Sequence, residues 1–390
     1  MQSSQRIKIL SAGRRLLQIF LITTVICTIF AIFFGFLILP EKLLAFILYM
    51  VLLFFIELVL FWVGIIMIYV SSLQLGIKWR VIGILCGWIP IVHIIVLLKM
   101  IKIVHAEVEF ETQKLELDAV RQENEECKTK YPLLMVHGVF FRDSRFFNYW
   151  GRVPKVLMRN GATIYYGEQQ SAASVADAGK ELAERIQKIV TETGCEKVNV
   201  IAHSKGGLDC RYAISSCGAA QYVASLTTIN TPHNGCLFAD YLLDKLPKKM
   251  QDFVAGRYNA ALRKLGDANP DFISAATDLK GSRSKSMNEE MPDQPGVYYS
   301  SYMSKMNRAE SGQFPLNMVY HLVRRFDGEN DGLVSVDSAK WGEQFTLVTV
   351  SGRRGISHGD MIDLNRENIP GFDIREFYVE LIKELKAKGL

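Results

Sequence analysis

Long apolar runs dominate the first hundred residues of the chain. The first run, 16–39, contains no charged residue and exceeds the roughly 20 positions that a helix needs to cross a bilayer core. The second run, 43–70, is apolar except for Glu57, and the third, 81–98, is uncharged. The pattern predicts about three transmembrane helices in a membrane region over residues 1–104.

The lysines and arginines beside these runs bear on the orientation of the chain. Three crossings place six of them in the cytoplasm and three outside, which puts the residues after 104 outside the cytoplasm. If the run 81–98 is only interfacial, the count becomes eight against one and the rest of the chain is cytoplasmic. The length of that run slightly favours the crossing, so we expect a multi-pass protein of the cell membrane whose larger part is extracytoplasmic.

The pattern changes twice after the membrane region. Residues 105–130 are rich in Glu, Lys, Gln and Arg with scattered apolar positions, which predicts a charged, solvated helical stalk. From residue 131, short apolar runs alternate with helical patterns such as Val175–Thr193 and Phe372–Lys388. This alternation predicts an α/β domain over 131–390 with a mainly parallel sheet, whose expected strands are Leu133–Val136, Thr163–Tyr166, Val198–Ala202, Val223–Ile229, Val297–Tyr302 and Phe345–Val350.

Composition excludes several classes of protein. A hydrophobic content of 49% is high for a soluble chain and agrees with an embedded part. The net charge of +5 is not concentrated in a basic domain, so we expect no nucleic-acid partner, and no protein partner can be inferred. The seven cysteines include no CxxC pair, which argues against a zinc site and a disulfide framework.

The sharpest chemical signal is a serine between a strand and a helix. The apolar run from Val198 leads into Ser204, and a helix is predicted from about Leu208. The residues around this serine are small, namely Ala202, Gly206 and Gly207, as required where a strand turns sharply into a helix. This is the pattern of a nucleophile elbow, in which backbone strain exposes the serine hydroxyl.

A serine nucleophile needs a base and an acid, which follow it in this class of fold in the order Ser, Asp, His. Of the seven histidines, only His358 fits that order. Asp331, in a glycine-bounded loop before an apolar stretch, is the predicted acid. Asp327 and Asp337 are the rival acids.

The tetrahedral intermediate of acyl transfer requires two backbone N–H donors. One is the N–H of Lys205, which follows the nucleophile, and the other is expected from a loop after an earlier strand. The strand Leu133–Val136 runs into His137 and Gly138, so we predict the N–H of Val139 as the second donor.

At these motifs the chain resembles the bacterial triacylglycerol lipases. The resemblance implies an α/β-hydrolase fold, and hydrolysis of lipid or other acyl esters by Ser204, Asp331 and His358 with Val139 and Lys205 as oxyanion donors. It also implies a helical lid-like insertion over 237–293, where Leu242 and Leu246 have helical spacing. The matching segments are Pro132–Gly138, Ala202–Gly206, Thr231–Gly235, Asn330–Val334 and His358–Asp360.

The chain departs from these lipases in two respects. Ser335–Ser338 occupies the stretch where relatives often have a cysteine of a disulfide. The family commonly binds one structural calcium ion, for which Asp360 matches one ligand, while the only upstream Asp between Tyr302 and Asn330 is Asp327. No cofactor is expected in catalysis itself.

Two functions of different class fit these observations. The first is a membrane-anchored serine lipase or carboxylesterase that forms an acyl-enzyme and acts at the lipid bilayer. The second is a catalytically silent membrane scaffold or binding protein with a hydrolase fold. A thioesterase, phospholipase or acyltransferase would use the same three residues, so the type of bond stays open at this point.

Overall fold

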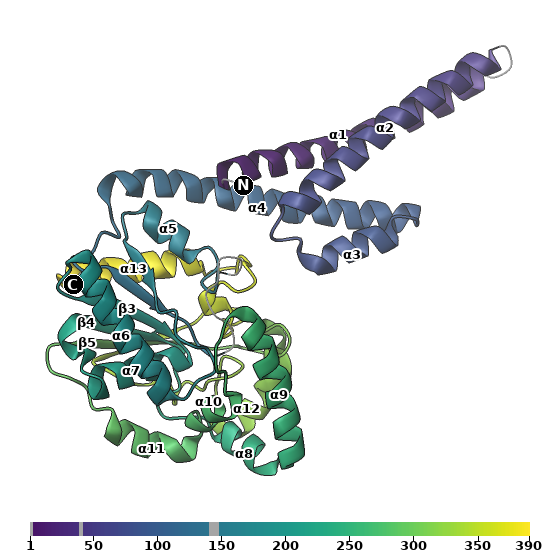
Figure 1. Cartoon of the computed structure of the whole chain (residues 1–390). Helices are drawn as coiled ribbons and strands as arrows, with labels where there is room; N and C mark the ends of the chain where they lie inside the picture. The colour runs from purple at the N-terminus through teal and green to yellow at the C-terminus, as the bar shows by residue number, and fades with distance from the viewer. Residues whose placement is uncertain (1–2, 39–41, 140–147) are drawn as a thin grey trace. The chain divides into compact units, whose positions relative to one another are not determined.

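The computed structural model describes residues 3–38, 42–139 and 148–390. The chain forms two compact units, Met1–Val120 and Arg121–Leu390, each of which is described by itself (Figure 1).

The first unit is helical. Its two long helices, α1 and α2, are long and apolar enough to cross a membrane, and most of their apolar side chains are exposed. The two remaining helices divide the third apolar run between them. The bounds are α1 Ser3–Ile38, α2 Leu43–Ser71, α3 Gly76–Cys86 and α4 Pro90–Asn124.

The third apolar run, 81–98, is therefore interrupted within its length. α3 ends at Cys86, and α4 begins at Pro90 after a short turn. Proline disfavours helical backbone at the residue before it but fits the first turn of a helix, and Gly87 is a weak helix former. The mean hydropathy of residues 81–98 does not detect such a turn.

The predicted stalk over 105–130 is helical as far as Asn124, where α4 ends. It is not uniformly solvated, because the side chain of Glu107 is fully buried. Glu107 makes polar contacts with Arg6 of α1 and with the turn that follows α2. A pattern of charged residues does not reveal such a tertiary contact.

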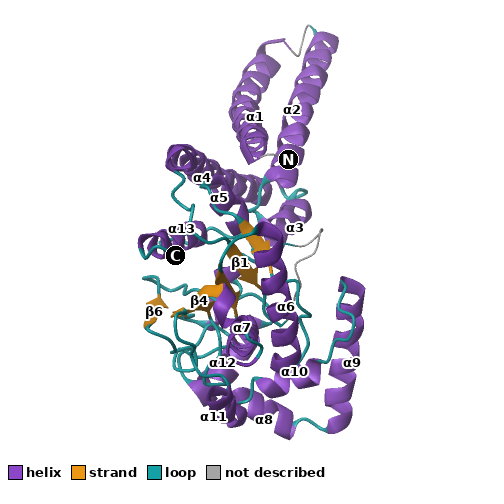
Figure 2. Ribbon diagram, turned by 60° about the vertical axis from the view of Figure 1, so that its left-hand side comes forward, coloured by secondary structure: helices purple, strands orange, loops and turns teal. Residues whose placement is uncertain are grey.

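The second unit is built on a parallel sheet of six strands in the order β2-β1-β3-β4-β5-β6 (Figure 2). This is the predicted architecture of an α/β-hydrolase domain, and all six predicted strands are present with bounds shifted by at most two residues. The strands are β1 Leu133–Val136, β2 Ile164–Tyr166, β3 Val198–His203, β4 Val223–Ile229, β5 Tyr298–Ser304 and β6 Gln344–Val348.

Both faces of the sheet are covered, which is why its central strands are continuously apolar. Leu133 and Met135 of β1 pack into one buried cluster together with helices α5 and α13. Leu134 and Val136 point to the other face and join a cluster with α6 and α7. The bounds of these helices are α5 Val153–Arg159, α6 Val175–Thr193, α7 Lys205–Ser216 and α13 Ile374–Ala387.

Four helices are inserted between β4 and β5, within the predicted range 237–293. Leu242 and Leu246, the positions with helical spacing in the predicted lid-like insertion, are half-buried. Exposed apolar side chains are found on α8 at Leu237 and Tyr241, and on α9 Met250, Phe253 and Val254 form an exposed apolar group near the start of the helix. The inserted helices are α8 Leu237–Lys245, α9 Lys248–Leu265, α10 Phe272–Asp278 and α11 Gly281–Glu290; α12 Leu316–Asp327 follows β5.

Candidate active site

Ser204 forms the whole connection between β3 and α7. Its backbone has φ 56° and ψ −134°, a conformation that non-glycine residues rarely adopt. The Ser204 N–H donates to the carbonyl of Ile229 on the neighbouring strand at 2.9 Å. Helix α7 begins directly at Lys205, earlier than the predicted start near Leu208. The serine is thus at the helix N-terminus, where N–H groups are free to bind an anion.

The glycines after the serine allow this close packing. A Cβ atom on Gly206 would collide with the carbonyl oxygen of His137, and one on Gly207 would collide with the side chain of Thr231. Both neighbours follow core strands of the sheet and cannot move away easily. The sequence prediction of small residues at this elbow is explained by these two contacts.

Asp331 and His358 form a buried hydrogen-bonded pair. The Oδ2 atom of Asp331 accepts a hydrogen bond from His358 Nδ1 at 2.6 Å and one from Asn230 Nδ2 at 2.6 Å. Its Oδ1 atom accepts the backbone N–H groups of Leu333 and Val334 at 2.9 and 2.8 Å. The carboxylate is completely buried, so these four donors fix its orientation. Asn230 was not singled out from the sequence.

The two rival acids have other partners. Asp327 accepts the backbone N–H groups of Leu237 and Phe238 at 2.8 and 3.0 Å, at the start of α8. The side chain of Asp337 is 82% exposed and pairs with Lys340. Asp331 is therefore the acid that lies against His358.

A buried tyrosine connects the two segments that flank Ser204. The hydroxyl of Tyr149 accepts the N–H of Gly138 at 3.0 Å and shares a hydrogen bond with Nδ1 of His203 at 2.7 Å. The His203 ring in turn lies 4.4 Å from the His358 ring, measured between centroids. Burial, and after it the electrostatic interaction with the neighbouring His358, hold the pKa of His203 well below its usual value, so His203 is neutral.

Neither Tyr149 nor the partner role of His203 was predicted. Tyr149 follows residues 140–147, which lie outside the described part of the chain, and no local pattern marks it as a site residue. Only its hydrogen bonds to Gly138 and His203 show that Tyr149 belongs to the site.

The predicted oxyanion donors belong to two segments that adjoin Ser204. The loop at Gly138 packs so closely that a Cβ atom there would approach the Cβ of Ser204 to 2.8 Å. Val139 follows directly and is buried. Lys205 provides the first N–H of α7. Two N–H groups next to a serine match the donor set that acyl transfer requires.

The side chain of Lys205 has a separate, structural role. It is buried and forms an ion pair with the buried carboxylate of Asp209, with Nζ and Oδ1 2.5 Å apart. Burial raises the pKa of Asp209 to about 7 although the ammonium group opposes this shift. The pair lies within the first turns of α7, immediately after the serine.

The surroundings of Asp360 do not fit a calcium site. Its Oδ2 accepts the N–H and the hydroxyl of Ser357, both at 2.8 Å, and its Oδ1 lies 3.3 Å from the Arg354 guanidinium. Arg354 also pairs with Glu367 at 2.6 Å. The arginine supplies the positive charge at this carboxylate. Within residues 3–38, 42–139 and 148–390, no cluster of three His, Cys, Asp or Glu residues could hold a metal ion. The sequence match at Asp360 does not extend to a ligand set.

Comparison with known proteins agrees with this geometry. Residues 132–269 match the family model described as palmitoyl protein thioesterase. Triacylglycerol lipase 2 of Saccharomyces cerevisiae is 31% identical over 258 residues, which cover 62% of this chain and 74% of the yeast protein. The chain belongs to the triacylglycerol lipase family. The triacylglycerol lipase of Pseudomonas fragi is 26% identical over 68% of this chain and 100% of its own length.

Solved structures confirm the fold of this lipase. A metagenomic carboxyl esterase superposes with a TM-score of 0.52 at 17% identity, covering 67% of this chain and 76% of the esterase. The match to the Pseudarthrobacter phenanthrenivorans triacylglycerol lipase, 38% identical, covers 54% of that relative. This protein is a serine hydrolase of the lipase and esterase class with an α/β-hydrolase domain.

Proposed function

We propose that this chain is a membrane-anchored lipase or carboxylesterase that hydrolyses acyl esters, with Ser204 as nucleophile and His358 and Asp331 as base and orienting acid. The observation that carries the proposal is the buried pair of His358 and Asp331, held at 2.6 Å, together with the strained elbow at Ser204, whose neighbour His203 has its ring 4.4 Å from the His358 ring. A histidine oriented by a buried carboxylate is the base that a serine hydroxyl needs.

The reaction follows from these positions. His358 takes the proton of the Ser204 hydroxyl through Nε2 while the Ser204 Oγ atom bonds to the ester carbonyl carbon. The N–H groups of Val139 and Lys205 stabilise the negative oxygen of the tetrahedral intermediate. His358 then protonates the leaving alcohol, and the same residues activate water to release the acid from the acyl-enzyme.

The membrane part of the proposal rests on α1 and α2, whose apolar side chains are exposed along helices long enough to span a bilayer. In water, an exposed surface of this size would be unfavourable. Within a bilayer it is the surface that lipid covers. Anchoring brings the enzyme to esters that partition into membranes.

The apolar patch on α9, defined by Met250, Phe253 and Val254, supports a lid that meets lipid. The three side chains are 50%, 63% and 44% exposed, and exposed lysines at 248 and 249 begin the same helix. Apolar side chains beside lysines are typical of helices that bind anionic membrane surfaces. We propose that this patch faces the bilayer and gates the entry of an acyl chain.

The catalytic proposal is tested by single and double substitution. Ser204→Ala and His358→Ala should each lower kcat for a short-chain ester by several powers of ten, and the double variant should be hardly worse, because such residues act as a unit. Ser286→Ala, an exposed serine on α11, is the matched control. Near wild-type turnover in Ser204→Ala, or the same loss in the control, would contradict the assignment.

The class of acyl bond is tested on the same preparations. Activity is compared on a triacylglycerol, a soluble short-chain ester and a palmitoyl thioester, the last because a palmitoyl protein thioesterase model matches residues 132–269. The proposal expects the oxygen esters to give the larger kcat/KM. A preference for the thioester would assign a thioesterase, and no turnover of any substrate would favour the silent scaffold.

The lid is tested by charging the patch on α9. Phe253→Asp combined with Met250→Asp should impair hydrolysis of long-chain, membrane-dispersed esters far more than of a soluble short-chain ester. Lys264→Asp, an exposed site on the same helix outside the patch, is the control. Equal losses on both substrates would mean that the helix has a structural role only.

A further inference from the structure

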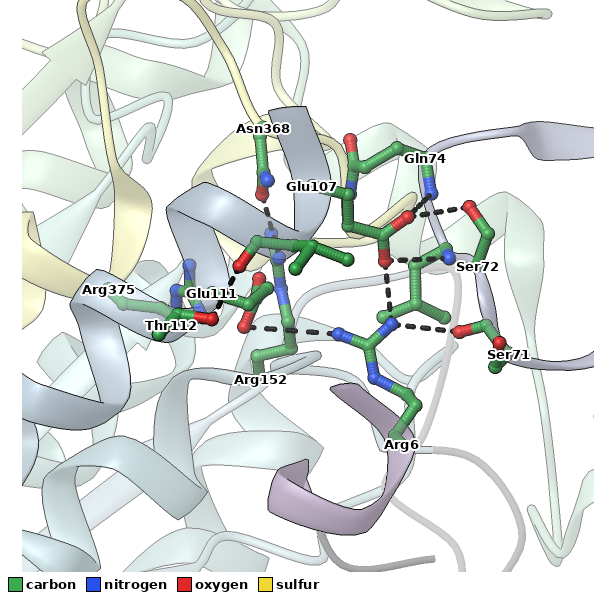
Figure 3. A network of polar contacts seen from close by, with 12 residues as sticks. Arg6, Ser71, Ser72, Gln74, Glu107, Glu111, Thr112, Arg152, Asn368 and Arg375 are labelled. Atoms are coloured by element: carbon green, nitrogen blue, oxygen red, sulfur yellow. Dashed lines mark hydrogen bonds and ion pairs between the residues drawn. The ribbon is translucent and has the colours of Figure 1, made fainter. Parts of the chain in front are cut away.

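A polar network joins three segments of the membrane region (Figure 3). The buried carboxylate of Glu107 on α4 accepts Arg6 Nη1 of α1 at 2.6 Å and the hydroxyl of Ser72 at 2.5 Å. Arg6 also donates to the carbonyl of Ser71 at 2.8 Å. The start of α1, the end of α2 and the middle of α4 therefore lie at one level. A charged network of this kind belongs at the polar boundary of a membrane.

The apolar segment between Ser72 and Glu107 must consequently leave this level and return to it. A third crossing would place Glu107 at the opposite surface, about 30 Å from Ser72. At 1.5 Å per residue, α3 is about 16 Å long and the apolar start of α4, residues 90–98, about 13 Å. Arg80 within α3 donates to the carbonyls of Ser72 and Tyr69 at 2.6 and 3.1 Å, so only residues 81–86 of α3 extend beyond the level of Ser72. Neither arm is long enough to cross the bilayer core. α3 packs closely on α2 and α4, since a Cβ atom on Gly83 would collide with the Tyr69 hydroxyl and lie 3.1 Å from the sulfur of Met100.

The position of the turn between the two arms agrees with this depth. Gly87, Trp88 and His93 line one cavity together with Glu57 of α2, and the His93 ring lies 5.1 Å from Phe61. Glu57 is at the centre of α2, which runs from Leu43 to Ser71. The tip of the hairpin is therefore level with the middle of the neighbouring span, not with its far end.

The surface of the hairpin suits the interior of one leaflet. Ile84, Leu85, Trp88 and Ile91 are 63%, 69%, 89% and 74% exposed. Exposed basic residues stand at its base, at Lys78 on one arm and at Lys99 and Lys102 on the other. Apolar tips with basic flanks insert among acyl chains and attract anionic headgroups.

We propose that residues 76–98 form a re-entrant hairpin in one leaflet, which places the N-terminus and all residues after 98 on the same side of the membrane. In the described residues, no helix that follows α2 is both long and apolar enough to cross a membrane. The shared side then carries eight of the flanking lysines and arginines, against Lys42 alone on the other. By the positive-inside rule that side is the cytoplasm.

This arrangement rests on the membrane anchoring in the proposed function and reverses the side that run length alone favoured. The lipase domain is cytoplasmic and acts on the inner leaflet. The seven free cysteines agree with a reducing compartment.

The test is cysteine accessibility in intact cells, in a full-length chain whose four incompletely buried cysteines (27, 86, 195 and 217) are replaced by alanine. Single reporters are Lys42→Cys, Lys78→Cys and Glu196→Cys. A membrane-impermeant maleimide should label Lys42→Cys in intact cells and the other two only after lysis. Ester hydrolysis by each variant in lysates reports separately on the proposed activity, so its loss would not be confused with a change of side.

Other labelling patterns would overturn the proposal. If Glu196→Cys is labelled in intact cells while Lys78→Cys is protected, residues 76–98 cross the membrane. If both are labelled before lysis and Lys42→Cys is not, the hairpin faces the opposite compartment. If none is labelled before lysis, α1 and α2 do not expose their connecting loop.

Discussion

The substitution Asp331→Asn distinguishes the role of this acid from mere structural support. Oδ1 accepts two backbone N–H groups, from Leu333 and Val334, so the asparagine oxygen will keep that position. Its NH₂ group then takes the place of Oδ2 and faces His358 Nδ1 and the Asn230 amide. The Asn230 amide cannot flip to accept a hydrogen bond from this NH₂ group. Its oxygen already accepts the N–H of Ser304 at 3.0 Å, and its nitrogen donates to the Ser304 hydroxyl at 2.8 Å.

The consequence for catalysis follows from the histidine tautomer. Facing a donor, His358 Nδ1 must become an acceptor, which moves the ring proton to Nε2. Nε2 then has no lone pair to take the proton of Ser204. We expect kcat to fall by about 10⁴, or about 5 kcal/mol of transition-state stabilisation, with KM nearly unchanged.

The assay is steady-state hydrolysis of a soluble short-chain ester, with thermal unfolding as the check on folding. Asp337→Asn, an exposed pair partner of Lys340, and Asp327→Asn at the start of α8 are the controls. A loss below tenfold in Asp331→Asn, or a larger loss in either control, would refute the tautomer argument.

Three further predictions concern residues around the site. Tyr149→Phe removes the hydroxyl that joins the oxyanion loop to the end of β3, and should lower kcat about tenfold to a hundredfold at constant KM in the same assay. Asp209→Ala leaves the Lys205 ammonium group buried without its partner and should cost about 3–5 kcal/mol in the free energy of unfolding, most of which the pair Lys205→Met with Asp209→Leu recovers. Since burial raises the pKa of Asp209 to about 7, its protonated form is favoured in the folded state, so wild-type stability should fall relative to that paired variant as pH rises from about 4 to 7. A calcium chelator should leave activity unchanged, whereas Arg354→Ala should lower the melting temperature because Asp360 loses its cation; inactivation by the chelator would contradict the arginine's role.

The fold of the catalytic domain was readable from the sequence because its strands are buried on both faces. Leu133–Val136 and Val223–Ile229 are buried at every position and match the predicted strands residue for residue. The order of Ser204, Asp331 and His358 was also readable, since each lies in a short segment with a local sequence signature. The structure then brings Asp331 and His358 to 2.6 Å.

Features that depend on tertiary contact could not be predicted. Tyr149 and Asn230 can be recognised only from their hydrogen bonds to His203 and Asp331, which lie 54 and 101 residues away in the sequence. The run 81–98 has the hydropathy of a span, whereas the proposed re-entrant hairpin rests on the contact of Glu107 with Ser72, 35 residues apart in the sequence. In the insertion, Leu242 and Leu246 are partly covered whereas Met250, Phe253 and Val254 of α9 are exposed, a difference that helical spacing does not reveal.

The most direct test of the central claim is the site of covalent labelling by a fluorophosphonate, which reacts with activated serine nucleophiles. The full-length protein is treated in detergent, and the modified peptide is located by mass spectrometry. One adduct on Ser204, lost in Ser204→Ala and in His358→Ala but retained in Ser286→Ala, is the predicted result. An adduct that persists in Ser204→Ala, or ester hydrolysis that the probe does not inhibit, would contradict the claim that Ser204 is the nucleophile.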